Sequence, residues 1–302
     1  MSRRSVDGEL LGRVYPGKMI RDGVVDLDPP AAGYLENFGV QWQRYRDTQL
    51  DSKNGTTISH DFLVRVLGSP LESLRGKTVL EIGAGAGRFS EHLAEHARLL
   101  ICVDSSDAIW VNAARGRSNV ALVHGDLFTM PAPVPPVDLV LCRGVLQHTP
   151  DPPAAIHRLH QLARPGGEVV FDIYGPGRLG RLEAKYLWRR VVPRVFAWSQ
   201  FEALLRTVAE PALRMRWRVK PLLPGRSKRV LDYFIPIWDY KGVLPLGDAE
   251  LVEWAILDTL DALYAVHDHP MTAAQVLAVI EGLACDVVSA DTANNFFRTR
   301  LR

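Results

Sequence analysis

The chain has few cysteines and no long apolar runs. Its three cysteines, Cys102, Cys142 and Cys285, lie far apart in the 302 residues. This spacing argues against a zinc-binding quartet and a disulfide framework, so we expect no metal and expect the thiols to be small core side chains. No apolar run is long enough to cross a bilayer, and "MSRRSVDGELLG" lacks the apolar region of a secretory signal. We therefore expect a cytoplasmic protein without a membrane span.

The net charge is only +2, but basic and acidic residues occupy different segments. Residues 178–230 hold 14 Lys and Arg against three acids, and residues 231–270 hold eight acids against Lys241 alone. We expect these two segments to neutralise each other or to meet partners of opposite sign. The basic segment raises nucleic acid as a substrate, but no RNA-binding module accompanies it, so nucleic acid is the weaker alternative.

From residue 76 short apolar runs alternate with helix-length segments, which is typical of a parallel sheet covered by helices. The predicted strands are 77–83, 99–106, 119–128, 136–148 and 167–175, and the predicted helices are 87–97, 107–116 and 151–167. After Gly175 the rhythm stops for about a hundred residues. It returns as a helix and two strands within residues 271–302. We interpret the intervening residues as a mostly helical insertion.

The predicted fold is α/β, with a Rossmann-like, seven-stranded, mostly parallel sheet, helices on both faces and a helical cap between the fifth strand and the last two. We expect four parts along the chain. They are an N-terminal appendage or lid (1–75), a ligand-binding core (76–175), a helical cap on the substrate side (176–270) and the elements that complete the core (271–302).

The stretch "EIGAGAGRF" places glycines at 83, 85 and 87 between a predicted strand and a predicted helix. Such a turn offers backbone N–H groups and the positive end of a helix dipole to a ligand. A dinucleotide fingerprint needs G-x-G-x-x-G, and its third glycine would stand where this chain has Arg88. A nicotinamide oxidoreductase is therefore disfavoured.

Acidic residues end the second and third predicted strands. Asp104 can accept from ribose hydroxyls, and Asp126 can accept from an adenine amino group while Leu127 packs on the ring. Because the carboxyl ends of parallel strands lie at one edge of a sheet, we expect these residues near the glycine turn. Together they describe an adenosyl site that needs no phosphate.

The successive motifs resemble those of class I S-adenosylmethionine-dependent methyltransferases over residues 76–175. They are "VLEIGAGAGRFS", "VDSS", "GDLF", "DLVLCRGVLQHTPDP" and "LARPGGEVVFDIY". The resemblance extends to a subgroup with "FG-x-QW-x-RY-x-x-TQLD" before the domain and "LDTLDALY" and "DHPMT" after the insertion. It implies an antiparallel last strand in "NFFRTRL". "YPGKMIRDGVVDL" resembles the remnant of a zinc ribbon that has lost its cysteines.

The resemblance implies S-adenosyl-L-methionine as cofactor and S-adenosyl-L-homocysteine as product. The glycine turn would hold the methionine end, Asp104 the ribose, Asp126 and Leu127 the adenine, and Arg143 would lie beside the sulfonium. The cofactor-binding residues expected from it are Glu81, Gly83, Ala84, Gly85, Gly87, Asp104, Ser105, Asp126, Leu127, Arg143 and Trp42.

His148, after the fourth predicted strand, is the candidate catalytic base, because an imidazole titrates near about pH 6.5 and suits proton removal at neutral pH. Its alternative role is a cap or a supporting hydrogen-bond partner. Trp42 and Phe38 are candidates for a lid over the cofactor, or for the aromatic face of a docked amphipathic helix.

The aromatic stretch at residues 232–242 is the candidate wall of an acceptor pocket, through Tyr233, Trp238 and Tyr240, or else ordinary core. His267 and His269 are two residues apart, and we interpret them as loop or pocket residues because no third metal ligand is near in the sequence.

We therefore predict a methyltransferase acting on a small molecule, such as a secondary metabolite of natural product biosynthesis. The alternatives are an RNA or protein methyltransferase of the same fold, and a cofactor-binding scaffold that no longer transfers methyl. The acceptor atom (O, N, C or S) and the oligomeric state stay open, and a homodimer is one alternative.

Overall fold

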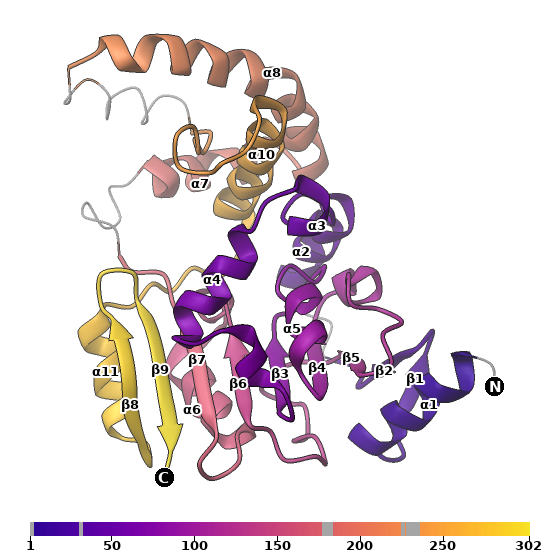
Figure 1. Ribbon diagram of the computed structural model, residues 1–302. Coiled ribbons are helices and arrows are strands. Elements are labelled where there is room, and N and C mark those ends of the chain that lie inside the picture. The colour runs from indigo at the N-terminus through magenta and orange to yellow at the C-terminus, as the bar shows by residue number, and fades with distance from the viewer. Residues whose placement is uncertain (1–2, 30–32, 177–183, 225–226, 228–235) are drawn as a thin grey trace. The chain divides into compact units, whose positions relative to one another are not determined.

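The computed structural model describes residues 3–29, 33–176, 184–224, 227 and 236–302 (Figure 1). These residues form two compact units. The first contains the described residues of the ranges 1–46, 57–175 and 267–302, and the second contains those of the ranges 47–56 and 176–266.

Within the described residues of the first unit, nine strands form one sheet. The strands are β1 (Met19–Arg21), β2 (Val24–Asp26), β3 (Thr78–Ile82), β4 (Leu99–Asp104), β5 (Val120–His124), β6 (Leu139–Cys142), β7 (Glu168–Asp172), β8 (Cys285–Asp291) and β9 (Phe296–Leu301). Their order is β1-β2-β5-β4-β3-β6-β7-β9-β8, and the five strands from β5 to β7 are parallel (Figure 1). The ends of β3, β4, β5 and β6 therefore lie along one edge, where open α/β sheets bind ligands.

The α/β class is confirmed, but the prediction of seven strands was wrong by two. The additional strands β1 and β2 form a hairpin in the segment that resembles a zinc-ribbon remnant, and β2 extends the sheet by pairing in parallel with β5. Val24 and Val25 are fully buried there. The hairpin is only three residues per strand, too short to show the alternation that reveals longer strands. The predicted antiparallel strand is β9, which pairs with β7 and β8.

Helices cover both faces of the sheet (Figure 1). The helices of the first unit are α1 (Arg3–Val14), α2 (Gly33–Arg44), α4 (Ile58–Leu67), α5 (Ser90–His96), α6 (Pro152–Leu162) and α11 (Ala273–Glu281), with 3-10 turns η1 (Leu71–Leu74), η2 (Asp107–Val111) and η3 (Leu146–His148). Leu11, Ile156 and Val276 place α1, α6 and α11 in one hydrophobic core. Leu63 and Leu93 place α4 and α5 in the core on the opposite face.

Side chains alternate along β3, so this strand contributes residues to the hydrophobic cores on both faces of the sheet. Leu80 and Ile82 point into the core of α6 and α11, whereas Val79 points into the core of α4 and α5. Glu81 therefore also lies on the α5 side of the sheet, with Cys102 of β4 beside it. The three cysteines are free and buried, which confirms their expected role as core side chains.

The second unit is helical. It contains α3 (Asp51–Asn54), α7 (Ala184–Val195), α8 (Trp198–Val219), η5 (Lys220–Leu222) and α10 (Asp248–Tyr264). The side chains of Leu205 and Leu213 of α8 and of Leu257 and Leu260 of α10 are buried. Within the basic segment, the stretch "RMRWRVK" at residues 214–220 belongs to α8 and η5, so its cations lie around a helix.

The basic and acidic segments of the second unit pair with one another, as their charges predict. Arg206 meets Glu253 at 3.2 Å, and Arg216 and Lys220 approach Asp239 at 3.7 and 3.8 Å. Arg216 is only 3% exposed, so its guanidinium also donates to the main-chain carbonyl of Ile237. Buried cations need such partners, and much of the basic segment is thus satisfied inside the unit.

Across the described parts of the chain, no helix combines the length and the apolar character that a membrane span requires.

Candidate functional site

The glycine turn joins β3 to α5, and its main chain is largely paired within the protein. Gly83 and Ala84 both donate to the carbonyl of Val103, at 2.8 and 3.1 Å, and Gly87 donates to the carbonyl of Ala84. Gly85 donates to Asp104 Oδ2 at 2.8 Å. The sequence predicted that these N–H groups would face a ligand, but the structure uses them to tie the turn to β4. A phosphate cradle needs N–H groups that point at the anion, so this turn suits a neutral or cationic ligand.

Two of the three glycines leave no room for a side chain. A Cβ at Gly83 would lie 2.1 Å from Val145 Cγ2, and one at Gly87 would lie 2.5 Å from the amide nitrogen of Ala113. A Cβ at Gly85 would meet only Trp42 and Asp104, at about 4 Å. Gly83 and Gly87 therefore serve the packing of the turn, and Gly85 faces the side on which a ligand would lie.

Gly87→Ala tests this packing against Gly116→Ala. Both glycines have positive φ, of 97° and 82°, but a Cβ at Gly116 has no neighbour within 4 Å. Gly116→Ala should therefore cost only the backbone strain, about 1–2 kcal/mol. Gly87→Ala should cost roughly 1–3 kcal/mol more, because the Cβ overlaps main-chain atoms. Urea unfolding of both variants measures the difference, and equal destabilisation would contradict the packing argument.

Asp104, at the end of β4, is partly exposed beside the turn. Its Oδ1 accepts from Ser106 N at 2.8 Å and Ser106 Oγ at 2.6 Å, and its Oδ2 accepts from Gly85 N. Burial raises the pKa of the Asp104 carboxyl, although these hydrogen bonds oppose the rise. A carboxylate has about four acceptor positions, so Oδ2 retains one for a ligand hydroxyl. Ser106 is thus the partner of both hydrogen bonds to Oδ1, and the predicted role of Ser105 in cofactor binding stays a prediction.

Trp42 lies next to the turn, since its ring is the nearest group to a Cβ at Gly85. Helix α2 carries Trp42 and packs on η2, where Gln43 Nε2 donates to the carbonyl of Asp107 at 3.3 Å. Gly39 permits this approach, because its Cβ position is 3.4 Å from Asp107 N. The structure thus brings Trp42, Gly85 and Asp104 together. The side chain of Phe38 lies outside the described residues.

Glu81 is the buried polar centre of the turn. It is 3% exposed, and its Oε2 accepts from Ser90 Oγ at 2.6 Å. Asn112 links this pair to the turn by donating to Ser90 Oγ and to the carbonyl of Gly85. Burial raises the pKa of the Glu81 carboxyl to about 8; the hydrogen bonds from Ser90 and Cys102 oppose the rise, and the Asp104 charge adds to it.

The raised pKa makes Glu81 a source of pH-dependent stability. Its folded-state pKa of about 8 lies above the ordinary 4.5, so the folded protein holds this proton more tightly than the unfolded chain does. The stabilisation is complete below about pH 4.5 and is lost as pH rises towards 8. Glu81→Gln should therefore make the free energy of unfolding fall less between pH 5 and 8 than it does in the wild type, measured by urea unfolding. Parallel profiles for the two proteins would refute this role.

Asp126 and Leu127 follow β5. Asp126 Oδ1 accepts from the main-chain N–H groups of Phe128 and Thr129, at 2.9 and 3.2 Å. No described residue donates to Oδ2, so this oxygen can accept from a ligand. Leu127 is 6% exposed and belongs to the core beneath it. Both residues lie at the sheet edge that carries Asp104.

Arg143, after β6, forms an ion pair with Asp172 at the end of β7, at 2.6 Å. The same carboxylate accepts from Gly144 N at 2.6 Å, and the guanidinium lies over the rings of Phe62 and Phe296. Burial raises the pKa of Asp172, while the Arg143 charge opposes the rise. These contacts give Arg143 a structural role at the β6 edge. Its contact with the sulfonium stays a prediction.

His148 ends η3, at the same edge of the sheet. Its Nδ1 lies 3.0 Å from the main-chain carbonyl oxygen of His267, so Nδ1 carries a hydrogen and Nε2 is the nitrogen that can accept a proton. Its ring meets the ring of Tyr174 edge-on, at 6.0 Å. Burial and the charges of His269 and His148 lower the pKa of His267.

Gln147 connects the segments around His148. Its Oε1 accepts from Tyr174 N, and its carbonyl accepts from His269 N at 2.8 Å. Residues 267–269 are thereby fixed against η3. Among the described residues, no group of three His, Cys, Asp or Glu side chains could hold a metal ion.

The predicted substrate residues belong to the second unit or lie outside the described residues. Trp238 is 45% exposed and donates its main-chain N–H to Thr259 Oγ1. Tyr240 is half-buried and donates its hydroxyl to Asp258. Tyr233 lies outside the described residues. That these aromatic rings line an acceptor pocket stays a prediction.

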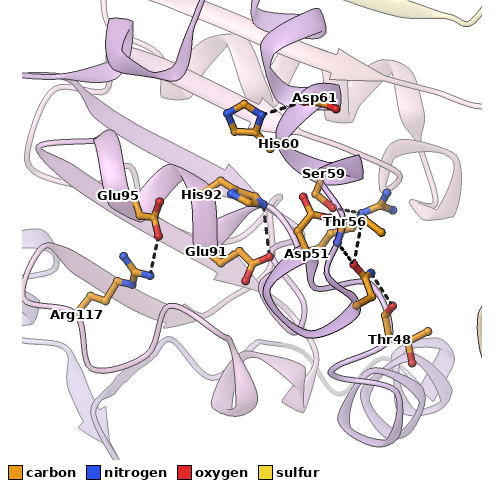
Figure 2. Close-up of polar contacts among 12 residues, drawn as sticks. Thr48, Asp51, Thr56, Ser59, His60, Asp61, Glu91, His92, Glu95 and Arg117 are labelled. Carbon is orange, nitrogen blue, oxygen red and sulfur yellow. Dashed lines mark hydrogen bonds and ion pairs between the residues drawn. The ribbon is translucent and has the colours of Figure 1, made fainter. Parts of the chain in front are cut away.

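Polar contacts also surround the elements that flank the turn (Figure 2). On α5, His92 faces Glu91 at 3.4 Å, and Glu95 meets Arg117 at 3.4 Å (Figure 2). Arg88 Nε donates to Ser59 Oγ of α4 at 3.1 Å. The residue that replaces the third glycine of a dinucleotide fingerprint therefore joins the turn to α4.

The comparison with known families gives a match to a methyltransferase domain over residues 80–171. This range contains the glycine turn, Asp104, Asp126 and His148. Residues 80–171 form a class I S-adenosylmethionine-dependent methyltransferase domain.

The relatives of this methyltransferase include proteins named ubiquinone biosynthesis O-methyltransferase. The protein of Alkalilimnicola ehrlichii is 27% identical over 212 residues, which cover 66% of this chain and 81% of that protein. That of Pseudomonas paraeruginosa is 35% identical over 104 residues, or 33% of this chain and 45% of that protein. The latter match thus spans less than half of the relative.

Solved structures similar to this methyltransferase include magnesium protoporphyrin IX methyltransferase from Synechocystis with bound S-adenosylhomocysteine. It is 15% identical with a TM-score of 0.47, over 89% of this chain and 97% of that one. The N-methyltransferase NodS from Bradyrhizobium japonicum is 25% identical with a TM-score of 0.37, over 45% and 74% of the two chains.

The cofactor of the methyltransferase domain, S-adenosylmethionine, fits the chemistry of the turn. Its ribose has hydroxyl donors and its adenine has an amino donor, and Asp104 Oδ2 and Asp126 Oδ2 are acceptors of the kind that such donors need. It carries no phosphate, in agreement with a turn whose N–H groups are used internally. Asn112 and Tyr174, which the sequence did not single out, support this region through contacts that only the folded chain creates.

Proposed function

We propose that this methyltransferase transfers a methyl group to a hydroxyl oxygen of a small molecule, with His148 as the general base. The single observation that carries the proposal is the hydrogen bond from His148 Nδ1 to the His267 carbonyl. It fixes the tautomer in which Nε2 accepts a proton, as a base beside a hydroxyl must.

The reaction needs alignment and removal of one proton. Bound S-adenosylmethionine supplies an electrophilic methyl group on a sulfonium sulfur. His148 Nε2 would take the proton of the acceptor hydroxyl as the oxygen receives the methyl group, and it would later release that proton to water. Tyr174 positions the His148 ring by its edge-on contact.

The turn and the acidic residues are proposed to hold the cofactor. Asp104 Oδ2 would accept a ribose hydroxyl, Asp126 the adenine amino group, and Trp42 would cover the side of Gly85 that faces the ligand. The shape of the turn would also contribute to cofactor binding, and it is maintained by Glu81, Gly83, Ala84 and Gly87. The packing of a ring over this side would exclude water from a reactive sulfonium.

The acceptor oxygen is proposed from the names of the relatives, which are O-methyltransferases of ubiquinone biosynthesis. A quinone precursor is a small molecule whose ring hydroxyl is acidic enough for a single imidazole to remove its proton. The secondary-metabolite acceptor expected from the sequence has no support from these names. Trp238 and Tyr240 remain the proposed acceptor-side rings, and a cytoplasmic location and a homodimer stay predictions.

The proposal is tested by calorimetry followed by methyl transfer. The protein should bind S-adenosylhomocysteine and not NADH. With labelled S-adenosylmethionine it should then methylate a dihydroxylated aromatic ring on oxygen, with product identified by mass spectrometry and NMR. Label in bulk RNA that falls steeply as salt rises would instead support an RNA methyltransferase. Tight binding of the cofactor without transfer to hydroxyl, amine or RNA acceptors would support the scaffold alternative.

A further inference from the structure

Helix α7 presents an apolar stripe on its exposed side. Leu187, Val191 and Val195 follow one another at intervals of four residues, and they are 43, 52 and 63% exposed. Side chains at this spacing lie on one face of a helix. Exposed aliphatic side chains are common singly, but a row along one helix face indicates a surface with a partner.

Arginines line this stripe. Arg190 and Arg194 are exposed, and each follows a residue of the stripe by three positions, so they form the adjacent row on the helix. Residues 184–195 contain four cations and no acid. The other cations serve different contacts, since Arg189 donates to the Ala262 carbonyl and Lys185 lies over the Tyr186 ring.

The opposite side of α7 is attached to its own unit. Val192 is 4% exposed, and the Arg189 guanidinium holds α7 to the carbonyl of Ala262 in α10. The neighbouring helix α8 also exposes apolar side chains, but two of its arginines, Arg206 and Arg214, pair with Glu202 and Glu210 of the same helix. Among the described helices of the second unit, α7 therefore combines exposed aliphatic side chains with two exposed arginines, Arg190 and Arg194, and it contains no acidic residue.

We infer that α7 docks on an anionic lipid surface, with its apolar stripe in the headgroup–acyl boundary and Arg190 and Arg194 at the headgroups. A basic helix with an apolar face is the pattern of helices that lie in a membrane interface. An anionic lipid surface matches both the aliphatic stripe and the arginine row, because the aliphatic side chains can contact acyl chains and the guanidiniums can contact anionic headgroups. RNA would satisfy the arginines alone, since bases stack on aromatic rings rather than on Leu and Val. This inference does not depend on the proposed methyl transfer.

The experiment is co-sedimentation of the full chain with vesicles of phosphatidylcholine alone and of phosphatidylcholine with phosphatidylglycerol. We expect binding to the anionic vesicles that weakens as salt rises. Two double variants test the helix. Arg190→Gln with Arg194→Gln removes the cations, and Leu187→Gln with Val191→Gln interrupts the apolar stripe. Each double variant should lower the partition coefficient about tenfold or more, because one removes two cation–headgroup contacts and the other removes two aliphatic side chains from the acyl boundary.

Matched controls are Arg75→Gln and Val243→Gln, which change an exposed cation and an exposed aliphatic side chain away from α7. Both should bind vesicles as the wild type does, and far-UV circular dichroism checks that every variant is folded. Equal binding to neutral and anionic vesicles, no binding to either, or unchanged binding in both α7 variants would overturn the inference. If the protein binds RNA, and the arginine double variant loses this binding while the Leu187 and Val191 double variant keeps it, then the partner of α7 is nucleic acid and not lipid.

Discussion

Replacing His148 with alanine is expected to lower kcat by about two to four orders of magnitude, with the affinity for S-adenosylhomocysteine changed by less than about twofold. The reason is the fixed tautomer of the ring. Nδ1 donates to the His267 carbonyl, which leaves Nε2 to receive the proton of the acceptor. Single-turnover kinetics with labelled cofactor and a dihydroxylated aromatic acceptor measure the loss, and calorimetry measures the affinity.

Two further measurements separate a base from a supporting hydrogen-bond partner. Added imidazole should restore part of the turnover of His148→Ala, because a diffusible base can replace a missing one but cannot rebuild a local fold. His157→Ala is the matched control, since His157 is an exposed histidine on α6. It should turn over as the wild type does. Full activity in His148→Ala, or loss without any imidazole rescue, would remove the base assignment.

The sequence predicts the central part of the fold well, because periodic signals there are local and strong. The apolar runs of β3 to β7 are four to six residues long, so the pattern predicts five strands of a mainly parallel sheet, although it does not give their order across that sheet. The hairpin of β1 and β2 carries no such signal. Its strands are stabilised by joining an existing sheet edge through β2 and β5, which is a long-range contact that no window of sequence contains.

The same distinction applies to the site. Gly83, Asp104 and Asp126 are recognisable from their places at strand ends. The partners that decide what these residues can do are not recognisable in that way. Ser106 occupies both acceptor positions of Asp104 Oδ1, and Asn112 ties Ser90 to the Gly85 carbonyl across 22 to 27 residues of sequence. Such contacts depend on the exact path of the turns after β3 and β4.

Arg143 has partners that its position in the sequence does not reveal. The resemblance places it beside the sulfonium, which stays a prediction, and the structure shows its guanidinium in contact with Asp172 at 2.6 Å and with two aromatic rings. A cation beside a sulfonium is electrostatically unfavourable unless an anion compensates it, and the buried Asp172 supplies that anion. The ion pair therefore explains how an arginine is tolerated at this edge of the sheet.

Replacing Asp104 with asparagine is expected to weaken binding of S-adenosylhomocysteine by about 1–3 kcal/mol, or roughly 5- to 150-fold. The asparagine keeps one oxygen for the Ser106 donors but presents an N–H₂ group where Oδ2 accepts from Gly85 and would accept from the ribose. Asp104→Ala should cost more, because it leaves the N–H groups of Gly85 and Ser106 and the Ser106 hydroxyl without this acceptor. Calorimetry of both variants measures the difference.

A ligand cycle isolates the ribose contact from damage to the turn. The 2′,3′-dideoxy analogue of S-adenosylhomocysteine lacks the hydroxyl donors, so the wild type should bind it more weakly, while Asp104→Asn should bind it about as well as it binds the parent compound. The coupling energy between carboxylate and hydroxyls is the difference of the two losses. Asp107→Asn, an exposed carboxylate three residues away, is the control and should change neither affinity. If the analogue and the parent compound lose equal affinity in Asp104→Asn, the carboxylate acts only through Gly85, and the ribose must be held by another residue.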